Sequence, residues 1–135
     1  MDLLFFSPAQ DETHRILDGL LRNIIHRERL LTCSSIEQLR RAMIHGSYDL
    51  LAGVFFPRTQ LDLSDLLKMR EHFRDLPIVL ILPDSDADTV ARGHGLRPRF
   101  LTYADADFHE LMAVVTRILL RRATHHYPLT EFAGR

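Results

Sequence analysis

The chain has 135 residues and carries 17 Lys and Arg against 18 Asp and Glu, for a formal net charge of -1. This length suits one domain with its own hydrophobic core and is too short for two. Because the net charge is close to zero, no global field draws the protein to nucleic acid or to an anionic membrane, and we expect direct contact with neither.

Cysteine usage and hydropathy predict the cellular setting. Cys33 is the single cysteine, which excludes an internal disulfide and a multi-thiolate zinc site and fits a reducing compartment. No apolar run approaches the roughly 20 residues that span a bilayer. The chain begins Met1-Asp2-Leu3, without the basic stretch of a signal peptide. We therefore expect a soluble cytoplasmic protein with Cys33 buried.

A short buried strand and an amphipathic helix open the chain. Four apolar residues, 3–6, precede Ser7-Pro8 and predict a strand that is covered on both faces. Asp11 and Glu12 follow, and acids suit the positive end of a helix. Apolar residues then recur at helical spacing from Ile16 to Ile25, which predicts a helix packed on one side of a sheet.

A weaker strand and a second helix come next. Residues 29–33 predict a short strand at or near a sheet edge. Ser34, with Glu37 three residues later, has the form of a capping box. The helix that follows is expected over residues 36–43 and to be stopped by Gly46.

The most apolar stretch runs from Asp49 to Pro57. Side chains from Leu50 to Phe56 are nearly all apolar, as in a central strand of a parallel sheet covered by helices on both faces. A polar loop over residues 58–60 separates this strand from another helix. The inward residues expected on that helix are Leu63, Leu66, Leu67 and Phe73.

A fourth strand is predicted between Pro77 and Pro83. The alternating acids of residues 84–88 suggest a calcium loop, but Thr89 stands where that loop needs glycine and Gly95 where it needs glutamate. These acids are instead expected to cap a short helix, 87–94.

A final strand, 98–102, and the clearest helix, 108–122, complete the pattern. We expect one domain over residues 1–122, and a tail or the start of a linker over 123–135. Five strand–helix units predict a parallel sheet with right-handed crossovers and helices on both faces. The economical strand order is 2-1-3-4-5, which places a site at the carboxyl ends of strands one and three.

Residues 2–122 resemble the receiver domains of two-component response regulators in the order and spacing of their predicted strands and helices and in the prolines and glycines that bound them. The run 49–57 looks like the third strand of that family, 77–82 like its fourth, and 95–102 like its glycine-led approach to strand five. The resemblance implies a flavodoxin-like (βα)5 receiver fold and a role in two-component signal transduction.

The phosphorylation chemistry of that family needs an acidic pair after strand one and a phosphoacceptor aspartate ending strand three. It also needs a Ser or Thr ending strand four and a lysine ending strand five. Counting back from Pro57 puts the phosphoacceptor at Gly53, and counting forward from Asp49 puts it at Val54. The full set of matching positions is Ser7, Pro8, Gly53 or Val54, Leu82 and Tyr103. The resemblance therefore implies a degenerate receiver, or pseudo-receiver, with no catalytic residue, metal or cofactor.

Four acids near the same rim offer an alternative, in which two of them meet a cation, although helix capping is the favoured interpretation. They are Asp11, Asp62, Asp84 and Asp86.

In the family, output and dimerisation use the face made by the fourth helix, fifth strand and fifth helix. On this sequence the face corresponds to Val90, Arg92, Arg99, Tyr103, His109, Met112 and Thr116. An aromatic residue at the lysine position would hold this face in one state. The leading hypothesis is a phosphorylation-independent signalling module that contacts a protein partner or forms a homodimer.

Two other functions stay open. A small-ligand sensor would use the emptied pocket lined by Ser7, Gly53, Leu82 and Tyr103. An enzyme of flavodoxin-like fold ranks last. The sequence has no glycine-rich phosphate loop before the first helix and no histidine pair at the i, i+4 spacing of a helical metal site.

Overall fold

The computed structural model describes residues 2–46 and 49–126. Its parallel strands form a five-stranded sheet in the order β2-β1-β3-β4-β5, so the predicted doubly wound fold is confirmed. The strands are β1 (Asp2–Phe6), β2 (Leu30–Cys33), β3 (Leu50–Phe55), β4 (Ile78–Leu82) and β5 (Phe100–Tyr103). The helices are α1 (Glu12–Arg22), α2 (Ile36–Ile44), α3 (Gln60–Lys68), α4 (Ala87–His94) and α5 (His109–His126), with short 3-10 turns η1 (Arg27–Arg29) and η2 (Arg70–Phe73).

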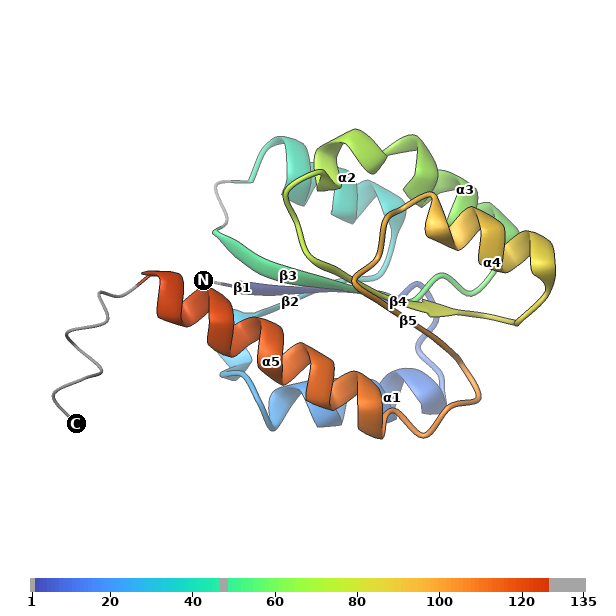
Figure 1. Cartoon of the computed structure of the whole chain (residues 1–135). Coiled ribbons are helices and arrows are strands. Elements are labelled where there is room, and N and C mark those ends of the chain that lie inside the picture. The colour runs from blue at the N-terminus through green and yellow to red at the C-terminus, as the bar shows by residue number, and fades with distance from the viewer. Residues whose placement is uncertain (1, 47–48, 127–135) are drawn as a thin grey trace, which may run out of the picture.

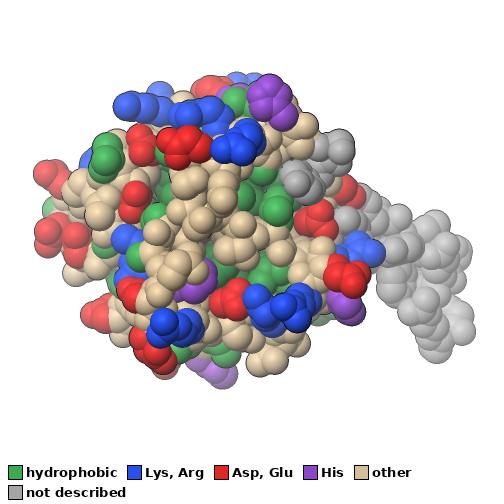
Figure 2. Space-filling model, turned by 180° about the vertical axis from the view of Figure 1, so that it is seen from behind, with side chains coloured by type: hydrophobic (Ala, Val, Ile, Leu, Met, Phe, Trp, Pro, Cys, Tyr) green, Lys and Arg blue, Asp and Glu red, His purple; other side chains and the backbone are tan. Residues whose placement is uncertain are grey.

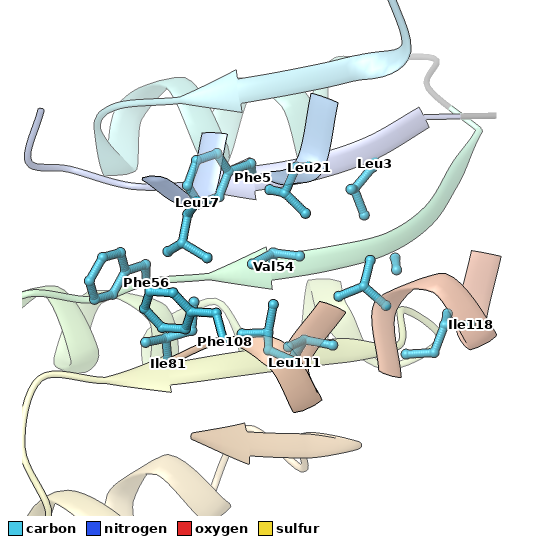
Figure 3. Close-up of a cluster of buried hydrophobic side chains, with 13 residues drawn as sticks. Leu3, Phe5, Leu17, Leu21, Val54, Phe56, Ile81, Phe108, Leu111 and Ile118 are labelled. Atoms are coloured by element: carbon cyan, nitrogen blue, oxygen red, sulfur yellow. The ribbon is translucent and has the colours of Figure 1, made fainter. Parts of the chain in front are cut away.

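Helices cover both faces of the sheet (Figure 1). α1 and α5 lie on one face, and α2, α3 and α4 lie on the other. Successive strand residues point to opposite faces, so Phe5 and Val54 join the cluster under α1 and α5, while Phe6 and Phe55 join the other. Figure 3 shows the first cluster. Each fully buried Leu or Phe contributes about 1.5–3 kcal/mol, which explains why the middle strands are apolar on both faces.

Helix caps are where the structure corrects the sequence interpretation. Ser35, not Ser34, is the N-cap of α2, and its side chain accepts a hydrogen bond from the Gln38 backbone N–H. The Gln38 side-chain oxygen reaches back to the Ser34 N–H at 2.7 Å, so the predicted Ser34–Glu37 box is wrong by one residue. A complete capping box joins Thr59 and Asp62 at the start of α3, so the capping expected of Asp62 is confirmed, while its partner Thr59 was not identified from the sequence.

Two of the expected acidic caps behave differently from each other. Asp11 is the N-cap of α1 and accepts from the His14 N–H at 3.1 Å, as predicted. Asp86 occupies the N-cap position of α4, but its side chain makes no capping hydrogen bond. Asp84 instead accepts from the Asp86 N–H at 3.0 Å, because the short loop lets the earlier acid reach that amide.

Element ends differ by a few residues from the expected ones. β5 begins at Phe100 rather than 98, and Phe73 belongs to η2 rather than to α3. α5 continues to His126, because no proline or glycine interrupts the stretch before Pro128. The boundary expected at 122 thus falls within a helix and stays a prediction, and residues 127–135 lie outside the described part of the chain.

The surface agrees with the balanced composition. On the face seen from behind, acidic and basic side chains are intermixed rather than gathered by sign (Figure 2). Within the described residues, no helix combines the length and apolarity that crossing a membrane requires.

Candidate functional site

The carboxyl edge of β1 and β3 is where the strand order reverses, and doubly wound folds bind ligands at such a point. Pairing between these strands continues past β3, because the Phe56 N–H donates to the Phe6 carbonyl at 2.9 Å. On the other side of β1, the Ser7 N–H donates to the Cys33 carbonyl at 2.9 Å. Ser7 and Phe56 therefore stand at the carboxyl edge, each one residue beyond its strand.

The residues that sequence counting assigned to the pocket do not all meet at this edge. Gly53 pairs with Leu4 and Ile78, so it lies within the sheet, and Val54 is only one residue closer to the end. Leu82 and Tyr103 are the last residues of their strands and pair with each other. Of the predicted set, Pro8 and Tyr103 alone are partly exposed. Gly53 and Val54 are therefore buried within the sheet, and the buried Ser7 and Leu82 leave no open pocket among the predicted residues.

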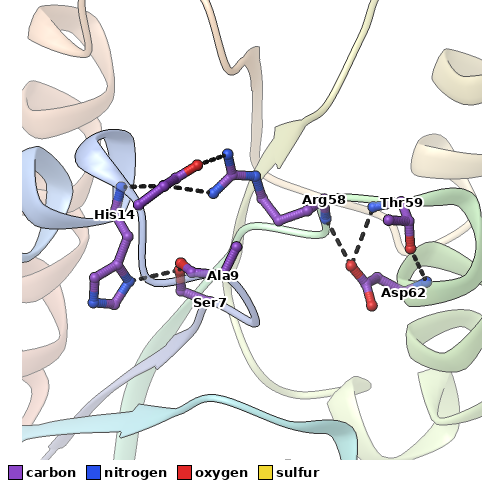
Figure 4. A network of polar contacts seen from close by, with 7 residues as sticks. Ser7, Ala9, His14, Arg58, Thr59 and Asp62 are labelled. Carbon is purple, nitrogen blue, oxygen red and sulfur yellow. Dashed lines mark hydrogen bonds and ion pairs between the residues drawn. The ribbon is translucent and has the colours of Figure 1, made fainter.

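An ion pair joins the two loops that leave this edge (Figure 4). Arg58, in the loop after β3, donates from Nη1 to Oδ1 of Asp11 at 2.9 Å and from Nη2 to Oδ2. The guanidinium carbon also lies 4.2 Å from the centre of the Phe56 ring, a cation–π distance. The Arg58 side chain is 20% exposed and that of Asp11 45%. Both oxygens of this carboxylate are therefore engaged by protein donors.

Electrostatics keep Asp11 ionised. The side-chain hydrogen bond from Arg58, followed by the backbone hydrogen bond from His14, holds the pKa of the Asp11 carboxyl well below its usual range. An opposite charge and hydrogen bonds to the charged form both act in this direction. The pair therefore stays charged throughout the neutral pH range.

A second polar contact fixes the turn between β1 and α1. Nδ1 of His14 lies 2.7 Å from Oγ of Ser7, and both side chains are buried. The His14 ring stacks on Phe5 with 5.4 Å between ring centres and 13° between planes. Because the Ser7 side chain is 0% exposed, we assign this contact to holding the turn beneath Asp11.

The residues expected on the interaction face differ in how far they are exposed to solvent. Arg99 and His109 are exposed, while Val90, Tyr103, Met112 and Thr116 are half-buried. Arg92 reaches the other way, with hydrogen bonds to the side chains of Gln60 and Ser64 on α3. It therefore joins α4 to α3 instead of extending over β5.

Two residues of the site, Arg58 and His14, were missed from the sequence. A signal for one of them was present. The predicted strand order brings the loops after β1 and β3 together, and these loops contain an acid, Asp11, and a base, Arg58. Opposite charges on adjoining loops predict an ion pair once the topology is assumed.

Comparison with known proteins supports the fold. No family model matches the chain, and no curated protein matches its sequence. Among solved structures, a response regulator receiver protein from Pseudoalteromonas atlantica is similar, with a TM-score of 0.70 and 17% identity over 88% of this chain and 97% of that one. A response regulator from Thermotoga maritima has a TM-score of 0.58 and 12% identity over 88% and 98%. The chain thus has the fold of response regulator receivers.

The side chains at the carboxyl edge do not fit the divalent cation and phosphoryl group that receiver chemistry uses. Hard divalent cations prefer several carboxylate or carbonyl oxygens. Here the Ser7 hydroxyl is bonded to His14, and Asp11 is bonded to Arg58. In the part of the chain that the structure describes, no three His, Cys, Asp or Glu side chains are grouped as metal ligands.

Proposed function

We propose that this chain is an atypical receiver-like signalling module that works without phosphorylation, through contact with another protein or a second copy of itself. The observation that carries the proposal is the Asp11–Arg58 pair. The Arg58 guanidinium supplies a permanent positive charge at the edge where receiver chemistry would need a metal ion and a phosphoryl group to bind.

The chemistry of the neighbouring residues supports this proposal. A phosphoryl acceptor must be a nucleophile that a phosphodonor can reach. The side chain directly after β3 at this edge is that of Phe56, which is 0% exposed and lies beneath Arg58. A charged, satisfied pair over a buried aromatic ring leaves no carboxylate at this position for attack.

The surface we assign to the contact is the α4–β5–α5 face, here represented by Arg99, Tyr103 and His109. β5 is an edge strand with all four side chains half-buried, and edge strands carry backbone groups that are free to meet another chain. No enzymatic step is assigned to the module, and its proposed place is the cytoplasm, which the free Cys33 fits.

Site-specific photo-crosslinking tests the proposal. A photoreactive amino acid replaces exposed His109 on the proposed face, and in a matched control it replaces exposed Glu28 in η1. Crosslinking is carried out in cells that express the chain, and on the purified protein with and without acetyl phosphate and Mg²⁺.

We expect protein adducts from position 109 and not from position 28, and the same yield with and without the phosphodonor. Equal adducts at both positions would remove the assignment of the face. A yield from position 109 that rises with acetyl phosphate would contradict independence from phosphorylation.

A further inference from the structure

A second site lies at the opposite edge of the sheet, where β4 and β5 begin. A cavity of about 320 Å³ opens between η2 and the turn from α4 to β5. Three arginines and one glutamate line it, and the side chains of Phe73 and Leu96, which are 3% and 5% exposed, form its apolar part. The charged residues are Arg70, Glu71, Arg74 and Arg97.

The charges in this cavity are not balanced. Glu71 pairs with Arg74, whereas the side chains of Arg70 and Arg97 make no hydrogen bond or ion pair with any residue that the structure describes. The pKa of Glu71 is lowered, first by the hydrogen bond from Arg74 and also by the charges of Arg70 and Arg97. Two positive charges therefore remain in excess within one small cavity of a chain whose overall charge is near zero.

Arg97 occupies a backbone conformation that favours glycine. Its φ is 54°, in the left-handed region that disfavours side chains with a Cβ. The residue follows the end of α4, where its N–H donates to the His94 carbonyl at 3.0 Å. Glycine would adopt this φ at lower cost, so the turn itself does not call for an arginine at this position.

We propose that this cavity binds a small anion bearing a diphosphate group, either inorganic pyrophosphate or a nucleoside diphosphate. The planar guanidinium matches phosphate oxygens with paired hydrogen bonds, and Arg70 and Arg97 approach the cavity from different segments. The volume lies at the lower end of the range for small-molecule sites. A compact cavity of this size suits a short polyanion better than an extended acidic peptide.

Titration of the full chain tests this site. ¹H–¹⁵N spectra are recorded at low ionic strength with pyrophosphate and, separately, with adenosine diphosphate, in the absence of Mg²⁺. We expect shifts concentrated at residues 70–76 and 95–98. Similar shifts with both anions identify the diphosphate as the recognised group, and tighter binding of adenosine diphosphate adds a contribution from the nucleoside.

Three variants and a control make the assignment specific. Arg97→Gly and Arg70→Gln should each lower the affinity about tenfold, the loss expected for one charge-assisted contact. Glycine suits the φ of residue 97, so this variant should keep its melting temperature. Glu71→Gln removes the competing carboxylate and should raise the affinity. Arg40→Gln, exposed on α2, is the control and should leave it unchanged.

The proposal is overturned if Arg40→Gln weakens binding as much as Arg97→Gly does, or if shifts spread over arginines throughout the chain. Tighter binding of oligoglutamate than of pyrophosphate would also overturn it, because the cavity would then be part of a surface for acidic proteins.

Discussion

Arg58 and Asp11 are 47 residues apart in sequence, yet their side chains form a doubly hydrogen-bonded ion pair that joins the loop after β3 to the loop after β1. The strand order reverses between these two strands. The protein therefore places its own guanidinium and carboxylate, held over the Phe56 ring, at the edge where this fold class binds ligands.

Removing the guanidinium should destabilise the protein more than removing an ordinary surface charge. Arg58→Ala loses two charge-assisted hydrogen bonds and a cation–π contact worth about 0.5–2 kcal/mol, and should lower the melting temperature by about 4 °C. Arg15→Ala is the matched control. It breaks a pair with Glu12 in which both side chains are mostly exposed, and should change the melting temperature by less than about 1 °C. Equal melting temperatures for the two variants would show that the Arg58 pair adds no stability.

The contribution of Asp11 should depend on pH in a defined direction. Its pKa in the folded protein is lowered by Arg58 and by the His14 N–H, whereas in the unfolded chain it is about 4. The stabilisation is therefore complete above that value and is lost as the pH falls toward the folded pKa. Asp11→Asn keeps a good N-cap, so the difference in unfolding free energy between wild type and variant measures what the charge of Asp11 contributes to stability. Urea unfolding should give a constant difference above about pH 5 and a smaller one at about pH 3; no change between these values would contradict the pairing.

Replacing Gly53 by any residue with a side chain should destabilise the protein. A Cβ at this position would lie 2.8 Å from Cε1 of Phe55 and 3.1 Å from Cδ2 of Leu76. The Phe55 ring is packed edge-on against Phe6 and Phe73 and cannot easily move. Gly53→Ala should therefore cost about 1–3 kcal/mol of unfolding free energy.

The control for this substitution is Gly19→Ala. Gly19 lies in α1, where an added Cβ meets nothing within 4 Å, so alanine should stabilise the protein by about 0.5–1 kcal/mol. Gly53→Asp should be more destabilising than Gly53→Ala, because it buries a carboxylate. Chemical denaturation measures the unfolding free energy of all three variants. A Gly53→Ala variant as stable as wild type would show that the Phe55 ring can move to make room for the added Cβ.

The Cys33 thiol should be unreactive in the folded protein. It is 2% exposed, and burial raises its pKa, so the reactive thiolate is scarce at neutral pH. Labelling with a disulfide reagent should be slow in buffer and complete in denaturant. Labelling in buffer at the rate of a free thiol would mean that the β2 edge opens readily.

Much of the fold could be predicted from the sequence because its signals are local. The run Leu50–Phe55 is apolar on both faces and fits only a covered central strand, and Asp11 has the chemistry of a helix N-cap. The cap of α2 was displaced by one residue because Ser34 and Ser35 are chemically alike. They differ in their partners: the Gln38 backbone N–H donates to the Ser35 side chain, whereas the Gln38 side chain accepts from the Ser34 N–H.

The site was harder to predict because its geometry depends on pairing between strands. Counting from Pro57 or from Asp49 assigned the phosphoacceptor position of the resembled family to Gly53 or Val54, although the apolar run itself was expected to continue to Phe56. The hydrogen bond from Phe56 to the Phe6 carbonyl shows that Phe56, two to three residues past those positions, stands level with the end of β1, which counting along one strand cannot reveal. Arg58 then acts through a contact with a distant loop, which no sequence motif marks.

The most direct test of the account is a ¹H–¹⁵N spectrum of the full chain before and after addition of beryllofluoride and Mg²⁺, which together mimic a phosphoryl group on a receiver aspartate. With Arg58 paired to Asp11 and Phe56 buried beneath it, the account predicts an unchanged spectrum. Saturable shifts at Ser7, Gly53 and Leu82 would contradict it, because they would mean that this edge still binds a phosphoryl group and a metal ion.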